Sequence, residues 1–176
     1  MAMRRRLVAV VTTGLMALAG SADAQVTAAG AAVLRLSAQR DTILSAADFA
    51  RLPRSTIRVP AAHRHGADSA PPTTTTYGGV ALADLLALVG APRDAALRGR
   101  TVSLYLLVEA SDGYRVVFSL DELSREGAAD PVILADRRDD QPLPADEGPW
   151  RVIAPGARHS RWIRQVARLS VREAAP

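Results

Sequence analysis

The stretch VEASDGYRVVFSLDEL, residues 108–123, concentrates side chains that could carry out chemistry. Its acids could serve as general acid and base, but that chemistry needs carboxylates brought together from separate elements into different environments. Here the acids lie in polar turns of one continuous segment. We therefore predict backbone roles for them: Asp112 in an Asp-Gly hairpin turn and Glu122 in a capping box with Ser119. Arg115 stays a candidate ligand, because it follows the turn and opposes the apolar face of its strand. No catalytic residue is predicted.

Histidine could supply metal ligands in the stretch AAHRHGADSAPPTTTT, residues 61–76, which lacks hydrophobic periodicity and is expected to be a long loop. His63 and His65 form an H-x-H pair that could bind Zn, Cu or Ni, with His159 as a distant third ligand. Two histidines at that spacing in a loop rich in Pro and Thr are more typical of solvated side chains than of a metal site. We therefore predict no metal site.

Arginine gathers toward the C-terminal end of the sequence, at Arg151, Arg158, Arg161 and Arg164. One interpretation is a solvated face on which each Arg pairs with Asp or Glu. The other is an anion pocket, to which backbone N–H groups around Gly156 would contribute. The residues alone leave both interpretations open.

Short helices and strands are expected to position these groups. Ser45 is predicted to be a helix N-cap with Asp48 three residues later. Residues 55–60 have the β-branched composition of a strand. Apolar residues at helical spacing predict a helix that begins near residue 82 and ends before Gly90.

The second half of the sequence predicts mostly strands. Alternation from Thr101 to Ala110 indicates one strand, with residues 114–118 forming the returning strand of a hairpin. Its inward face would comprise Val102, Leu104, Leu106, Val108 and Ala110. Further strands are expected at residues 132–135 and 150–154, and around residues 169–171. This mixture indicates an α+β domain with mostly antiparallel strands.

Residues 1–24 are predicted to be a cleavable signal peptide. Arginines at positions 4–6 precede an apolar stretch from Leu7 to Gly20, and Ala22-Asp23-Ala24 forms a small-residue cleavage site. We expect cleavage after Ala24 and a periplasmic location. The alternative is an uncleaved membrane anchor, for which the apolar stretch is short. We expect no stable membrane insertion once the signal is removed.

Composition excludes several classes of chemistry. The sequence has no Cys, which removes thiolate nucleophiles, iron–sulfur clusters and Cys-bound metals. The formal net charge is +4, and the three Arg and one Asp of residues 1–24 account for a net +2 of it, so the remainder carries +2. That charge is too small to favour a nucleic-acid partner. Nothing in the sequence identifies a protein partner.

Three segments in this order resemble the molybdopterin-binding domain of the sulfite oxidase family, and more closely its small, exported, stand-alone bacterial versions. They are YGGVALADLLALVGAP, VEASDGYRVVFSLDEL and VILADRRDDQPLPADEGPWRVIAPGARHSRWIRQVARLSV. The resemblance runs from about Ser45 to Val171. It implies an α+β fold of mixed, mostly antiparallel sheets, partly barrel-like, with short helices. The chain would then divide into a signal peptide (1–24), a leader with a first strand (25–44) and the molybdopterin-binding-like domain (45–173).

The resemblance also implies a cofactor site. In the family a pterin-dithiolene cofactor, molybdopterin, holds molybdenum, and a Cys after an early strand adds a sulfur ligand. The matching segment here, Pro60–His63, reads P-A-A-H. The family's closing motif binds the anionic end of the cofactor, and it matches Gly156, Arg158 and Arg161. The implied ligand is therefore molybdopterin or a small anion, held by Arg158 and Arg161, with further candidates at His63, Arg151 and Arg115.

Together these features predict an exported, single-domain module that binds a cofactor or anion without the usual Mo–Cys catalytic site. One alternative is a periplasmic molybdenum-dependent oxidoreductase in which His63 or a solvent oxygen replaces the thiolate. Another is a structural or interaction protein that kept the fold and lost the pocket.

Overall fold

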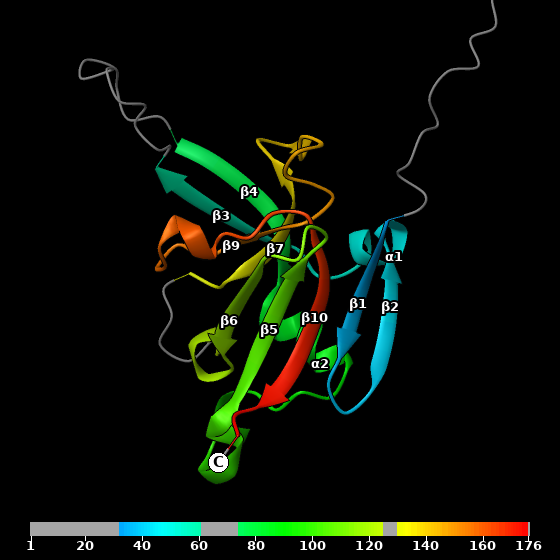
Figure 1. Ribbon diagram of the computed structural model, residues 1–176. Helices are drawn as coiled ribbons and strands as arrows, with labels where there is room; N and C mark the ends of the chain where they lie inside the picture. Colours follow the sequence, from blue (N-terminus) through cyan, green and yellow to red (C-terminus); the bar gives the residue numbers. More distant parts are fainter. Residues whose placement is uncertain (1–31, 61–73, 125–129, 176) are drawn as a thin grey trace, which may run out of the picture.

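The computed structural model describes residues 32–60, 74–124 and 130–175, and the strands in these ranges form two sheets. The first, sheet A, is built from strands in which apolar and polar residues alternate. Within the described ranges, sheet A has the strand order β2-β1-β10-β5-β6 (Figure 1). Val108 and Leu169 face each other on neighbouring strands and are fully buried, so one face of the sheet belongs to the core. The strands are β1 (Val33–Ser37), β2 (Asp41–Ser45), β5 (Leu104–Ala110), β6 (Arg115–Ser119) and β10 (Val166–Glu173).

Sheet B carries most of the candidate site. Its strands β3, β4, β7 and β8 neighbour one another in that order, and β9 also pairs with β7. Their bounds are β3 (Ser55–Pro60), β4 (Thr74–Ala81), β7 (Ile133–Arg138), β8 (Gln141–Pro142) and β9 (Arg151–Ile153). Every pairing in the two sheets is antiparallel except that of β1 with β10. The mixed, mostly antiparallel α+β fold is thus confirmed, but the sheets stay open and do not close into a barrel.

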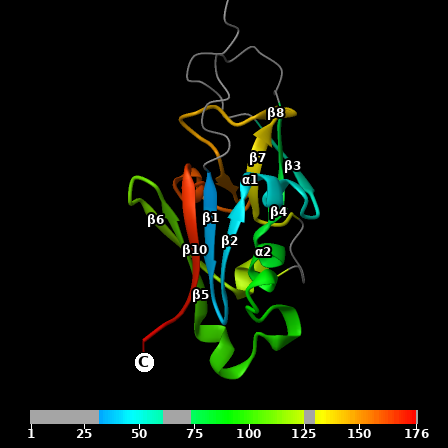
Figure 2. The ribbon, with the colours of Figure 1, turned by 90° about the vertical axis from the view of Figure 1, so that its right-hand side faces the viewer.

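Short helices follow the strands and contribute to the core between the sheets, which Figure 2 shows side by side. Phe49 of the first helix packs against Trp150 with ring centroids 5.7 Å apart, and Leu82 and Leu85 of the second are fully buried. None of the helices in the described ranges is long and apolar enough to cross a membrane. The helices are α1 (Ala46–Ala50) and α2 (Leu82–Leu88), with 3₁₀ turns η1 (Asp94–Ala96), η2 (Gly99–Ser103), η3 (Asp121–Leu123) and η4 (His159–Arg161).

Local signals place several element ends as predicted. The N–H of Asp48 donates to the Ser45 hydroxyl at 3.1 Å, and the N–H of Ser45 donates back to the Asp48 carboxylate. This capping box begins α1. Gly90 follows α2 with a φ of 79°, a left-handed conformation that glycine accommodates without strain.

Several elements differ from the sequence prediction. The strand expected from Thr101 begins only at Leu104. The Thr101 hydroxyl accepts a hydrogen bond from the N–H of Arg98 and donates one to the Ala96 carbonyl. These bonds stabilise the 3₁₀ turn η2 in place of the first residues of the strand. Val102 is consequently exposed instead of inward-facing. The loop expected to reach Thr76 ends earlier, since residues 74–76 pair with β3 as part of β4. Strand β2 is not predicted by any local pattern.

Candidate functional site

The Asp-Gly turn and the capping box after it have the predicted backbone roles. The N–H of Tyr114 donates to Asp112 Oδ1 at 2.9 Å, and Gly113 has a φ of 87°. The N–H of Ser119 donates to Glu122 Oε1 at 2.8 Å, and the N–H of Glu122 donates to Ser119 Oγ at 3.1 Å. The box begins the 3₁₀ turn η3. Both carboxylates therefore hold the backbone in place.

Arg161 is held by groups of β6 and η3. Its guanidinium donates to the Glu122 carboxylate at 2.7 and 3.2 Å and to the Val117 carbonyl at 2.6 Å. The same guanidinium lies over the Phe118 ring, 4.1 Å from the centroid, which is a cation–π contact. Because Glu122 compensates the charge of Arg161, this side chain ties η4 to β6 and has little charge left for a phosphate.

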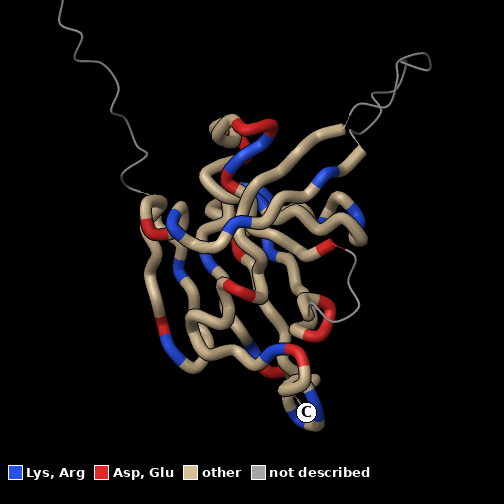
Figure 3. Tube along the Cα trace, turned by 180° about the vertical axis from the view of Figure 1, so that it is seen from behind, with Lys and Arg blue, Asp and Glu red and all other residues tan. Residues whose placement is uncertain are grey.

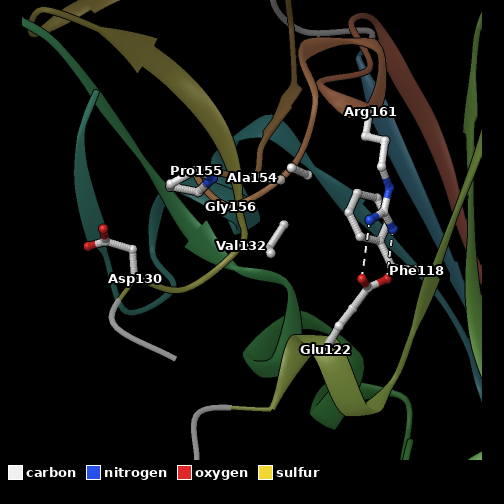
Figure 4. A pocket seen from close by; sticks show the side chains of 9 residues that line it. Phe118, Glu122, Asp130, Val132, Ala154, Pro155, Gly156 and Arg161 are labelled. Atoms are coloured by element: carbon white, nitrogen blue, oxygen red, sulfur yellow. Dashed lines mark hydrogen bonds and ion pairs between the residues drawn. The ribbon is translucent and has the colours of Figure 1, made fainter. Parts of the chain in front are cut away.

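Arg161 and Glu122 line a cavity of about 500 Å³. Figure 4 shows this ion pair on one side of the cavity and Asp130 on the other, with Val132 and Ala154 between them. Two carboxylates against one guanidinium give the wall a net negative charge, which disfavours an anion. The cavity is therefore poorly suited to the anionic end of a cofactor, although Gly156 of the closing motif also lines it.

The other candidate arginines are more exposed. Arg115 projects from the outer face of β6 and donates to Glu109 at 3.0 Å. Arg164 approaches Asp146 at 3.8 Å. Arg158 precedes η4, and its side chain has no hydrogen-bond or ion-pair partner in the part of the chain that the structure describes. Basic and acidic positions are interleaved along the chain (Figure 3), as the interpretation of paired charges expects.

Arg151 differs from these arginines because most of its side chain is buried. It lies on β9 with 17% of its side chain exposed, and its Nη1 donates to Glu147 Oε2 at 2.8 Å. The other carboxylate oxygen of Glu147 accepts a hydrogen bond from Nη1 of Arg138, also at 2.8 Å. Burial alone lowers the pKa of Arg138, but Glu147 and Tyr77 outweigh it and raise that pKa above its ordinary value. One carboxylate is thus the counter-charge of two guanidinium groups.

Arg151 lines a second cavity, of about 240 Å³, between sheet B and η4. Tyr77 and Thr75 come from β4, and His159 and Trp162 come from η4 and the residue after it. The Trp162 indole donates to the Ala154 carbonyl at 2.8 Å, and the His159 ring packs edge-on against it with centroids 4.5 Å apart. The full lining is Val59, Pro60, Thr75, Tyr77, Arg151, His159 and Trp162.

The predicted ligands are therefore divided between several places. Arg161 lines the larger cavity and Arg151 the smaller one, whereas Arg115 and Arg158 line neither. His63 and His65 lie outside the described residues. Among the described residues, no group of three or more His, Cys, Asp or Glu side chains could hold a metal ion.

Tyr77, Arg138 and Glu147 complete the region around Arg151, and the sequence does not single them out as site residues. Arg138 and Glu147 belong to a stretch that reads as a polar turn. The pairing of β4 with β7 places Tyr77 opposite Arg138, far away in sequence. The spacing of four residues between Glu147 and Arg151 is the one local signal of their ion pair.

Comparison with known proteins identifies the family. The family model described as the oxidoreductase molybdopterin binding domain matches residues 34–176, most of the chain. The chain belongs to this family. The predicted resemblance is thereby confirmed, and molybdopterin is the cofactor associated with its fold. No curated protein gives a significant match.

A solved structure supports the fold assignment. The sulfane dehydrogenase SoxCD from Paracoccus pantotrophus matches with a TM-score of 0.63 and 19% sequence identity. The match covers 82% of this chain and 39% of the SoxCD chain, so this chain spans well under half of that chain's length. At this identity the likeness concerns the fold alone.

The residues of this chain fit only part of what the cofactor requires. With no Cys in the sequence, the chain offers no thiolate to molybdenum. Of the two arginines in the closing motif, Arg161 is engaged by Glu122, while Arg158 has no partner among residues 32–60, 74–124 and 130–175. Anion binding is thus compatible with the site, and thiolate ligation is not.

Proposed function

We propose that this chain is an exported member of the family that binds a cofactor or small anionic ligand and has no thiolate-ligated molybdenum centre. The absence of Cys from the whole sequence carries this proposal. No other side chain supplies the soft anionic sulfur that a thiolate offers to a metal.

Two further observations support the proposal. The buried Arg151, and Arg158, which has no partner among the described residues, leave positive charge available for an anion, although Arg161 does not. Residues 1–24 have the basic, apolar and small-residue segments of a cleavable signal, which supports export to the periplasm with cleavage after Ala24.

Metal and pterin analysis tests the proposal. We expect the protein, isolated from the periplasm of a pterin-producing host, to contain far less than one molybdenum per chain. A Cys-containing member of the family, produced in the same host, provides the control for cofactor loading. One molybdenum per chain would overturn the proposal and support an oxidoreductase in which His63 or a solvent oxygen replaces the thiolate.

A further inference from the structure

One face of sheet A is left uncovered by the described elements. Figure 2 places α1, α2 and the labelled strands of sheet B on one side of sheet A, and no labelled element on the other. Along β1 and β6, exposed side chains on this open side alternate with buried ones on the core side. We call the open side the outer face of sheet A. Its charged residues are Arg35, Asp41, Glu109, Arg115, Arg168 and Arg172.

Four of these charged residues form one row across the sheet. Arg35 of β1 lies directly opposite Arg168 of β10. Glu109 of β5 follows next to Arg168, and Arg115 of β6 lies opposite Glu109. Neighbouring strands are about 5 Å apart, and like charges directly opposite each other destabilise a sheet. The pair of Arg35 and Arg168 therefore does not stabilise the fold through its charge.

Carboxylates compensate only part of the positive charge. Glu109 is shared, because Arg115 approaches its carboxylate at 3.0 Å and Arg168 at 4.0 Å. The side chains of Arg35 and Arg172 have no ion-pair or hydrogen-bond partner in the ranges that the structure describes. Four arginines against two acids leave the outer face with a net charge of +2. The face is therefore suited to an acidic partner.

Apolar side chains lie beside the arginines. In the row next to Glu109 and Arg115, Leu107 lies opposite Val117, which is 50% exposed. Ile43, which is 57% exposed, lies opposite Arg35 at the edge of the sheet. Arginine next to exposed apolar side chains is typical of the surfaces through which proteins bind other proteins.

The charge of the face also distinguishes between possible occupants. A second copy of this chain would bring an equal positive charge against it, and the two faces would repel. An anionic membrane attracts a surface in proportion to its net charge, and a charge of +2 gives only weak attraction. An acidic protein surface can instead place a carboxylate against each of Arg35 and Arg172, with two hydrogen bonds to each guanidinium. The acidic protein is the occupant that fits best.

We propose that the outer face of sheet A is a docking surface for an acidic region of another protein. Carboxylates of the partner pair with Arg35, Arg168 and Arg172, and its apolar side chains cover Leu107 and Val117. Five strands form a face about 20 Å wide, which suits a small, transient interface. The inference goes beyond the proposed function, because it concerns neither the cofactor nor the two cavities.

Poly-L-glutamate, which presents the carboxylates of such a partner, is the probe for the first test. We expect saturable binding to the full chain that weakens steeply as the salt concentration rises. In amide NMR spectra, the signals of β1, β6 and β10 should move more than those of sheet B. Poly-L-lysine is the control and should not bind. Absence of saturable binding, or shifts confined to sheet B, would overturn the proposal.

A double variant that keeps the fold gives the second test. Arg35→Gln with Arg168→Gln should weaken the binding of poly-L-glutamate about fivefold or more, because two charged donors are lost. The matched control, Arg51→Gln with Arg164→Gln, removes the same charge from exposed positions outside the outer face. It should bind nearly as the wild type does. Equal losses in the two double variants would overturn the proposal.

A substitution that adds a carboxylate keeps the proposal testable if the first double variant does not fold. Val117→Glu should weaken the binding of poly-L-glutamate, since it places a negative charge between the arginines of the face. Val102→Glu is its control, because Val102 is similarly exposed, at 53%, and lies in η2. A loss in Val102→Glu as large as that in Val117→Glu would contradict the proposal.

The other two occupants are tested separately. Vesicles that contain phosphatidylglycerol should not sediment with the protein at physiological salt, and the protein alone should sediment as a monomer. Vesicle binding that Arg35→Gln with Arg168→Gln abolishes would overturn the proposal in favour of a membrane surface. A dimer that the same double variant abolishes would overturn it in favour of a second copy of this chain.

Discussion

Arg151 and Arg161 carry the same guanidinium group in opposite environments. Arg161 is compensated by Glu122 and stacked on Phe118, so it holds two elements together. Arg151 shares its carboxylate with a second arginine, and its buried Nε has no hydrogen-bond partner in the ranges that the structure describes. Apart from Glu147, four residues before Arg151, their neighbours in sequence do not distinguish them. The difference arises mostly from partners that lie far away in the sequence, which a reading of the sequence alone cannot supply.

Gly79 is a residue at which a single methyl group would be costly. A Cβ there would lie 2.1 Å from the Leu134 carbonyl oxygen and 2.6 Å from the Ala135 Cα, both of them backbone atoms of β7. Gly79→Ala should therefore lower the free energy of unfolding by about 2–3 kcal/mol, since the two strands would have to separate. Urea denaturation measures the change.

The preceding glycine is the matched control for this substitution. A Cβ on Gly78 would meet only side-chain atoms at ordinary contact distance, with Arg137 Cβ at 3.7 Å. Gly78→Ala should change the free energy of unfolding by less than about 1 kcal/mol. Equal losses for the two variants would show that β4 and β7 do not approach as closely as described.

At the scale of elements, the segment between β8 and β9 joins two strands through one carboxylate. Glu147 binds Arg138 at the end of β7 and Arg151 at the start of β9. Glu147→Gln leaves the largely buried Arg151 and the more exposed Arg138, with 17% and 36% of their side chains exposed, without a counter-charge. Because solvent screens part of this charge, we expect a loss of about 1–2 kcal/mol in the free energy of unfolding, measured by urea denaturation.

The neighbouring acid gives the comparison. Asp146 is exposed and reaches only Arg164, at 3.8 Å. Asp146→Asn should therefore change the free energy of unfolding by less than about 0.5 kcal/mol. If Glu147→Gln were equally mild, the charge network of β7 and β9 would not stabilise the fold.

Elements with local signals are the ones that the sequence predicts correctly. The capping box of Ser45 defines the start of α1, and Gly90 defines the end of α2 within a few residues. Strand β3 matches the predicted residues 55–60. The start of β4 and the whole of β2 depend on pairing with a strand elsewhere in the chain. Side-chain bonds of Thr101 override the alternating pattern before β5.

For the whole molecule, β1 and β2 are part of sheet A and not an accessory to it. β1 pairs with both β2 and β10, and its Leu34 and Leu36 are fully buried. A chain that begins at Ser45 would expose one side of β10 and lose both leucines from the core. We expect this truncated chain to show no cooperative thermal unfolding by circular dichroism.

A chain that begins at Gln25 is the control for this truncation. It retains β1 and β2 and should melt at the temperature of the longer chain. Cooperative unfolding of the chain that begins at Ser45 would mean that β10 and β5 form a stable sheet without β1.

The position of β10 also affects when the molecule can fold. This strand is synthesised after all the others in the two sheets, yet it lies between β1 and β5 at the centre of sheet A. Until residue 173 has left the ribosome, β1–β2 and β5–β6 remain two separate hairpins with no strand to join them. Such non-local pairing forms slowly. Sheet A would thus be completed only after the last strand has been synthesised.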